Sequence, residues 1–142
     1  MYLGLHHTHI LLRYFILIML VVVIAMAVVG LIKKKPYGRI DNKLSLYLLI
    51  FTHLQLVVGL ILYFVSPNVK FSADTMKDPS LRYWTVEHVV GMLVAIALIT
   101  VARISSKKLN LDSAKHMRLL VMNVVALVLI ISIILLSGRR IL

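Results

Sequence analysis

The sequence predicts an all-α membrane protein in which four transmembrane helices form one bundle. Of its 142 residues, 61% are hydrophobic and only five are acidic, and the mean hydropathy is +1.00. A soluble core of this size could not hide so much apolar surface. The chain also contains four apolar runs, each about as long as the roughly 20 residues that cross a bilayer.

The four runs account for most of the chain. They lie at residues 10–32, 44–65, 84–102 and 119–136. The longest connection, residues 66–83, is too short to fold as a domain. We therefore expect a single domain, residues 1–142, with any binding site built between helices.

Residues that stop or start helices flank the runs. We expect the first helix to end at Gly30 and the lysine-rich segment that leads to Pro36, because glycine and proline end helices and lysines suit their carbonyl ends. Asp41 or Asn42 is expected to cap the second helix. The remaining boundaries are expected at Pro67, at Asp78 and Pro79, at Asp112 and Ser113, and at Gly138.

The net charge of +11 is concentrated beside two connections. Ten basic residues lie there: Lys33, Lys34, Lys35, Arg39, Lys43, Arg103, Lys107, Lys108, Lys115 and Arg118. The positive-inside bias makes this side cytoplasmic and places both termini on the outer side of the membrane. Anionic lipid headgroups are the expected contacts. A nucleic-acid partner is not expected, because no aromatic residues for base stacking alternate with the lysines.

The chain contains no cysteine, which excludes disulfides, iron–sulfur clusters and thiolate chemistry. The N-terminus lacks a basic region and a cleavage site, and the first run is long enough to span a membrane. We therefore interpret it as a retained helix rather than a signal peptide.

Six histidines carry the candidate chemistry. His6, His7 and His9 precede or enter the first run, His53 lies near the middle of the second, His88 lies in the outer half of the third, and His116 lies at the inner end of the fourth. Polar groups at membrane depth are costly and usually turn inward, toward partners, water or a cofactor.

Depth suggests which histidines could share one iron. At a rise of about 1.5 Å per residue, counted from the inner helix ends, His53 lies roughly 15 Å up, His88 about 22 Å and His9 about 34 Å. Axial ligands of one haem should lie at similar depth, so His53 with His88 is the preferred pair. His9 with His88 is second, because tilt shortens the height of the long first helix. His116 matches none of them, and we expect a headgroup contact there or a ligand to a second, inner cofactor.

The first helix offers a second constellation. His6, His9 and Arg13 recur at i, i+3 and i+7 and so share a face if the helix begins early. Arg13 could bind a haem propionate through a bidentate contact, or its side chain could extend to the outer surface. An alternative reading of His6, His7 and His9 is a surface site for copper or zinc.

The stretch TVEHVVGML places Glu87 beside His88 at the start of the third run. Gly91 and Ala95 follow His88 at i+3 and i+7, a stripe that could leave room for a flat macrocycle or simply let two helices approach closely. Glu87 points about 100° away from His88 around a helix. It could orient another histidine, receive a proton or extend to the outer surface.

Four segments together resemble a family of small four-helix bacterial membrane proteins commonly labelled cytochrome b. They are HTHILLRYFIL, FTHLQLVVGLILYFVSP, LRYWTVEHVVGMLVAIALIT and AKHMRLL, one from each helix. The resemblance implies a b-type haem protein of the inner membrane, with His9, His53, His88 and His116 as the motif histidines. The ending SIILLSGRRIL departs from the proline- and tryptophan-containing ending expected of relatives.

Inward histidines in a transmembrane bundle can also hold haem on physical grounds, since neutral imidazoles ligate iron and apolar helices exclude water. We expect haem b and an electron carrier rather than a stand-alone catalyst. Respiratory-complex subunits would be its partners, or a quinone bound near Gln55 and Glu87. Two alternatives stay open: a haem-free accessory or assembly subunit of such a complex, and a small proton or ion carrier that uses His53, Gln55 and Glu87 as relay groups.

The charge distribution gives a topology prediction. In a chain without cysteine, Lys35→Cys should react with a membrane-impermeant thiol reagent only after the cells are opened. Asp74→Cys, in the expected external loop 67–82, should react in intact cells. Labelling of Lys35→Cys from outside would contradict this orientation.

Overall fold

The computed structural model describes residues 2–65, 74 and 76–136. Its elements are α1 (Tyr2–Ile32), α2 (Arg39–Val65), α3 (Pro79–Arg82), a π-helical turn η1 (Tyr83–Glu87), α4 (His88–Lys107) and α5 (Asp112–Leu136). No strand occurs among the described residues. Four segments are long and apolar enough to cross a membrane: Leu3–Ile32, Arg39–Val65, Pro79–Lys107 and Asp112–Leu136. The predicted all-α class with four membrane-spanning helices is confirmed, and this architecture indicates a multi-pass membrane protein.

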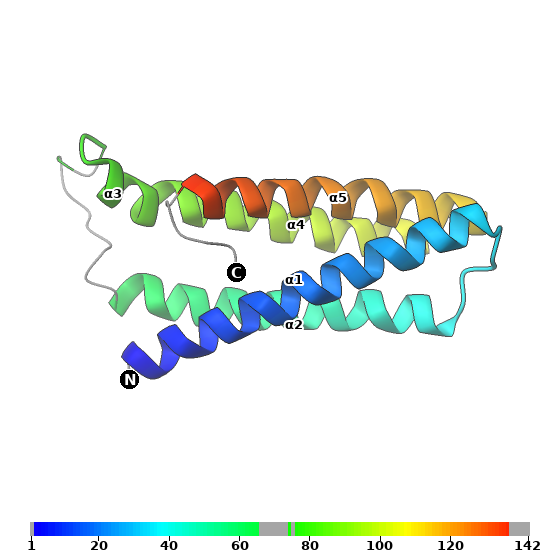
Figure 1. Cartoon of the computed structure of the whole chain (residues 1–142), viewed down its shortest axis with the longest axis horizontal. Coiled ribbons are helices and arrows are strands. Elements are labelled where there is room, and N and C mark those ends of the chain that lie inside the picture. The colour runs from blue at the N-terminus through cyan, green and yellow to red at the C-terminus, as the bar shows by residue number, and fades with distance from the viewer. Residues whose placement is uncertain (1, 66–73, 75, 137–142) are drawn as a thin grey trace.

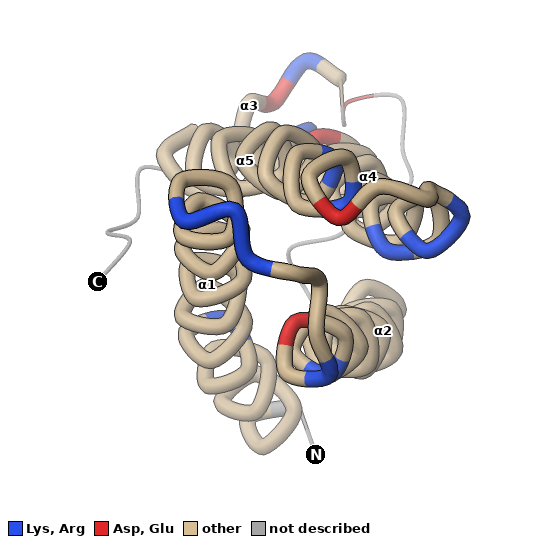
Figure 2. Tube along the Cα trace, turned by 90° about the vertical axis from the view of Figure 1, so that its right-hand side faces the viewer, with Lys and Arg blue, Asp and Glu red and all other residues tan. Residues whose placement is uncertain are grey.

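The four long helices run roughly side by side, and α1 crosses the others obliquely (Figure 1). Helix α4 packs along α5, whereas α1 packs on both α2 and α5 and α2 meets α4 less extensively. Near its C-terminus α1 lies beside α5, and near its N-terminus it lies beside α2 (Figures 1 and 2). Helix α1 therefore changes its neighbour along its length, from α2 near its N-terminus to α5 near its C-terminus.

The largest cluster of buried apolar side chains joins all four long helices. It contains Ile16, Leu20, Val23, Leu48, Ala95, Ile99, Ala126, Ile130 and Ile134. Small side chains on α4 and α5 let these helices approach closely. Gly91 shows this most clearly, because a Cβ there would collide with the Ile133 side chain of α5. The stripe Gly91–Ala95 therefore brings two helices together at Gly91, and the alternative that Gly91 leaves room for a macrocycle is wrong.

Two of the helix starts follow the sequence expectations. Asp78 caps α3, its Oδ1 accepting from the backbone N–H groups of Ser80 at 2.9 Å and Leu81 at 3.4 Å. Helix α5 begins at Asp112. The boundaries expected at Pro67 and Gly138 lie outside the described residues.

The other helix limits differ from the expectation. Helix α2 begins at Arg39, and Asp41 sits in its first turn with Oδ2 accepting from Gly38 N–H at 2.9 Å. Helix α1 begins at Tyr2 and continues past Gly30 to Ile32. The turn that closes α1 has Lys34 at φ 54° and a hydrogen bond of 2.9 Å from Lys35 N–H to Gly30 O. A non-glycine residue thus takes the left-handed closing position, and Gly30 does not end the helix.

Gly30 instead makes room for His116. A Cβ at Gly30 would lie 2.5 Å from the His116 ring. His116 is only 1% exposed, its Nε2 lies 3.1 Å from Lys35 O, and its ring centroid lies 5.6 Å from that of Tyr37. The expected headgroup contact of His116 is therefore wrong, because the ring is buried between α1 and α5 and ties α5 to the first connection.

Arg103 also lies inside the bundle, at 7% exposure. Its Nη1 donates to Ser45 Oγ at 2.6 Å, to Asn42 O at 2.9 Å and to Asn42 Oδ1 at 3.1 Å. Hydrogen bonds of this kind offset part of the cost of burying a charge. Arg103 thus joins α4 to the start of α2, where these helices otherwise pack less extensively.

The basic residues of the first and third connections gather at one end of the bundle, which Figure 2 views end-on. Helix α1 begins and α5 ends at the opposite end (Figure 1). The two connections that the charge argument assigns to one side therefore lie on one side of the molecule.

The contact between Gly30 and His116 predicts the effect of a single methyl group. Gly30→Ala should lower the stability of the detergent-solubilised protein by about 1–3 kcal/mol, because the buried His116 ring has to move. Gly4→Ala is the matched control, since a Cβ at Gly4 meets no atom within 4 Å. Equal thermal unfolding midpoints for Gly30→Ala and wild type would contradict the packing described.

Candidate functional site

A cavity of about 190 Å³ lies between α1, α2 and α4, and Tyr83 of η1 and Ile130 and Ile134 of α5 also line it. Its α1 lining lies between His6 and Leu17, in the half of α1 that approaches α2 in Figure 1. Protein interiors contain few voids larger than a water molecule. A space of this size inside a small bundle is therefore the natural candidate for a binding site.

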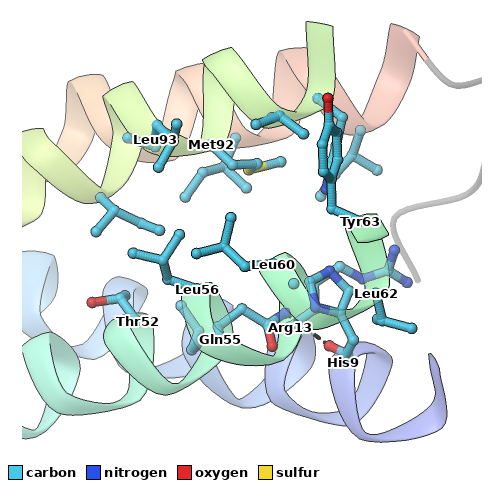
Figure 3. Close-up of a pocket in the computed structure, with 18 of the residues that line it drawn as sticks. His9, Arg13, Thr52, Gln55, Leu56, Leu60, Leu62, Tyr63, Met92 and Leu93 are labelled. Atoms are coloured by element: carbon cyan, nitrogen blue, oxygen red, sulfur yellow. Dashed lines mark hydrogen bonds between the residues drawn. The ribbon is translucent and has the colours of Figure 1, made fainter. Parts of the chain in front are cut away.

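The walls of the cavity change character along its length. Leu56 and Leu60 of α2 face Met92 and Leu93 of α4 across its middle (Figure 3). His9 and Arg13 of α1 and Tyr63 of α2 lie together toward one end (Figure 3). His6 and His88 also line it. The site thus combines apolar walls with a few convergent polar groups, as small-molecule sites commonly do.

His9 and His88 meet inside this cavity. Their ring centroids lie 6.2 Å apart, and the ring planes are inclined by 65°. The depth estimate prefers His53 as the partner of His88, but the structure brings His9 there instead. Helix α4 runs on to Lys107, past the Arg103 from which depth was counted, so His88 lies higher above the inner end than expected. The oblique path of α1 (Figure 1) in turn shortens the height of His9.

His53 points away from the cavity. Its side chain is exposed on α2, and its Nδ1 lies 2.8 Å from Leu49 O of its own helix. It does not line the cavity, whereas Thr52, Gln55 and Leu56 do. Depth along α2 cannot show whether His53 or a neighbouring residue faces the cavity, because successive residues point about 100° apart around a helix. The preferred pairing of His53 with His88 is therefore not assembled within one chain.

The π-helical turn η1 directs His88 into the cavity. The backbone N–H of His88 donates to Tyr83 O, five residues earlier, so residues five apart lie nearly above each other. The rings of Tyr83 and His88 are accordingly 5.8 Å apart. Single π-turns inside helices frequently occur at functional sites. Nothing in the sequence pattern signals this turn.

Two tyrosine hydroxyl groups hold η1 against its neighbours. Tyr83 Oη donates to Ile133 O of α5 at 2.8 Å, and Tyr63 Oη donates to Thr85 O at 2.8 Å. The turn that presents His88 is thereby fixed to α5 on one side and to α2 on the other.

Helix α2 holds His9 from the opposite side. Gln55 Nε2 donates to the backbone O of His9 at 2.8 Å, which Figure 3 marks with a dashed line. A Cβ at Gly59 would lie 3.3 Å from His9 Cε1 and 3.8 Å from its Nδ1. The His9 ring therefore packs directly over the backbone of α2. The sequence analysis assigned no role to Gly59, because a single glycine in an apolar run is uninformative.

Arg13 lies beside the pair and faces the cavity. Its Nη2 donates to Tyr14 Oη at 3.1 Å, and its guanidinium carbon lies 4.8 Å from the centroid of the Tyr14 ring. Its Nε is buried and makes no hydrogen bond within the described residues. Arg13 can therefore offer a further donor to an anionic group inside the cavity.

Other arrangements expected from the sequence are not assembled. Among the described residues, no group of three or more histidine, aspartate or glutamate side chains could hold a metal ion, so the surface site of His6, His7 and His9 does not form. Glu87 Oε1 accepts from Arg82 Nε at 2.7 Å and does not line the cavity. The relay of His53, Gln55 and Glu87 therefore has no common space.

Comparison with models of protein families, with curated proteins and with solved structures found no match for this chain. The residues that line the cavity are therefore the basis on which a function can be proposed.

Proposed function

We propose that this chain is a b-type haem protein that carries electrons in or beside a bacterial respiratory chain, and that His9 and His88 would hold the haem iron. The pair of imidazoles inside an apolar cavity is the observation that carries this proposal. His9 thus takes the place of His53 in the ligand pair, and His116 has a packing role against Gly30.

The spacing of the two rings fits ligation of a single metal ion. Imidazole nitrogens bind metal ions at about 2.0–2.1 Å, so two rings that would hold one ion have centroids no more than roughly 6.4 Å apart. The observed separation is 6.2 Å. In addition, His9 Nδ1 is buried and makes no hydrogen bond within the described part of the chain. A buried polar atom of this kind is usually satisfied by a partner.

Haem, when bound, supplies reversible one-electron chemistry. The residues of the chain provide its surroundings. Leu56, Leu60 and Met92 exclude water, which also helps to set a reduction potential. Arg13 supplies positive charge for a propionate. Neither Glu87 nor His53 has a role in this arrangement, because neither lines the cavity.

The proposal includes an orientation and partners. With the basic connections in the cytoplasm, the end of the cavity that holds His9 faces the outer side of the inner membrane. Electrons would then be exchanged near that surface with subunits of a respiratory complex or with a quinone. Lipid surrounds the bundle, and the basic end meets anionic headgroups.

Histidine variants test the ligand assignment. Protein produced with ample haem supply should give a low-spin b-type spectrum on reduction, and His9→Ala and His88→Ala should each abolish it. His53→Ala is the control and should keep the spectrum, since His53 points away from the cavity. Wild-type protein without haem would contradict the proposal and favour the haem-free accessory subunit. Loss of haem in His53→Ala, with His9→Ala unaffected, would instead support His53 as the partner of His88, as the depth estimate predicts.

Arg13 provides a second prediction. Arg13→Leu should lower haem retention or shift the midpoint potential while the protein stays in the membrane, because it removes one charged donor beside the ligands. Arg82→Leu removes the same charge outside the cavity, where Arg82 pairs with Glu87, and should leave both quantities unchanged. Identical redox titrations of Arg13→Leu and wild type would show that Arg13 only anchors the outer end of α1.

A further inference from the structure

We infer that α2, which supplies no ligand, sets the position and the ring angle of His9 through Gly59 and Gln55. This inference rests on the proposed function for its redox consequence. The two residues are four positions apart on α2 and therefore lie on one face of that helix. Both face the cavity, and both contact His9.

Gly59 lets the His9 imidazole lie close against α2. The ring packs over the bare backbone of α2, where an added Cβ would approach Cε1 to 3.3 Å. A contact this short requires the neighbouring ring to give way by a few tenths of an ångström. The centroid of the same ring lies 6.2 Å from that of His88. A side chain at position 59 should therefore displace the His9 imidazole and change its spacing and angle to His88.

Gln55 fixes the backbone from which that imidazole projects. Its amide Nε2 donates to His9 O at 2.8 Å, a carbonyl that belongs to the first half of α1. Its Oε1 is buried and makes no hydrogen bond within the described residues. Since a carbonyl oxygen can only accept, the amide NH2 group of Gln55 must face His9. This hydrogen bond sets the height of α1 against α2 at the level of the ligand pair.

Gly59 and Gln55 are therefore positioning residues. Gly59 sets the spacing and angle of the His9 ring, and Gln55 sets its height. The orientation and strength of an axial ligand tune the electronic state of an iron centre. Small changes on α2 should then alter the properties of bound haem without removing it.

Two variants test this inference. Gly59→Ala and Gln55→Leu should retain the reduced b-type spectrum but shift the midpoint potential and the g values of the ferric protein in electron paramagnetic resonance. In haem-free protein labelled with ¹⁵N-histidine, both should also shift the ring signals of His9, identified by their loss in His9→Gln. The second readout does not need haem.

Two other glycines provide controls. Gly4→Ala lies in open space and should change nothing. Gly30→Ala should lower stability through His116 yet leave the g values and the His9 signals as in wild type. Unchanged g values and unchanged His9 signals in Gly59→Ala would overturn the inference, as would an equal change in Gly30→Ala. If wild type binds no haem but its His9 signals move in Gly59→Ala, the positioning role stands and the electron-carrier proposal falls.

Discussion

Hydrocarbon offers no hydrogen-bond partner, and this constraint explains where most polar side chains of the bundle lie. Thr100, Ser105 and Ser132 satisfy their hydroxyl groups on carbonyl oxygens one turn earlier in their own helices. Groups that cannot be satisfied so locally turn inward, as Arg103 does when it donates to Asn42 and Ser45. The histidine pair obeys the same rule, since both rings lie within the bundle rather than against lipid.

The oblique path of α1 creates the space that the pair occupies. Where α1 packs on α5, His116 fills the contact and glycine is needed opposite it. Where α1 leaves α5, the cavity opens, and its apolar middle is walled by leucine and methionine side chains of α2 and α4. Backbone contacts from η1 and α2 then hold His88 and His9 on opposite sides of this space. A close-packed end and an open end within one bundle thus separate structural histidines from those available to a ligand.

The sequence predicts the number of long helices and the position of their apolar centres, because long apolar runs have few alternatives in this composition, but each helix extends beyond its apolar run. It also places the start of the third helix at Asp78 and Pro79, where the structure shows Asp78 as the cap. It assigns Gly30 the wrong role. A residue without a side chain can end a helix or leave room for a neighbouring ring, and only the packing of the adjacent helix shows which of the two applies. Depth along a helix can be counted from sequence, but the direction around it and the inclination of α1 cannot. For that reason the sequence favours His53 as the partner of His88, whereas the structure brings His9 there. The π-helical turn η1 has no sequence pattern of its own and is not predicted.

The central claim is that His9 and His88 face each other across the cavity while His53 does not. In a chain without cysteine, it can be measured without any cofactor. Membranes containing His9→Cys with His88→Cys are treated with a short bifunctional thiol reagent. The protein is then cleaved at a protease site introduced into the connection between α2 and α3, which separates both position 9 and position 53 from position 88, and it is examined for linked fragments. The account predicts an efficient link for this pair and little for His53→Cys with His88→Cys. A link that forms only in the second pair would contradict it.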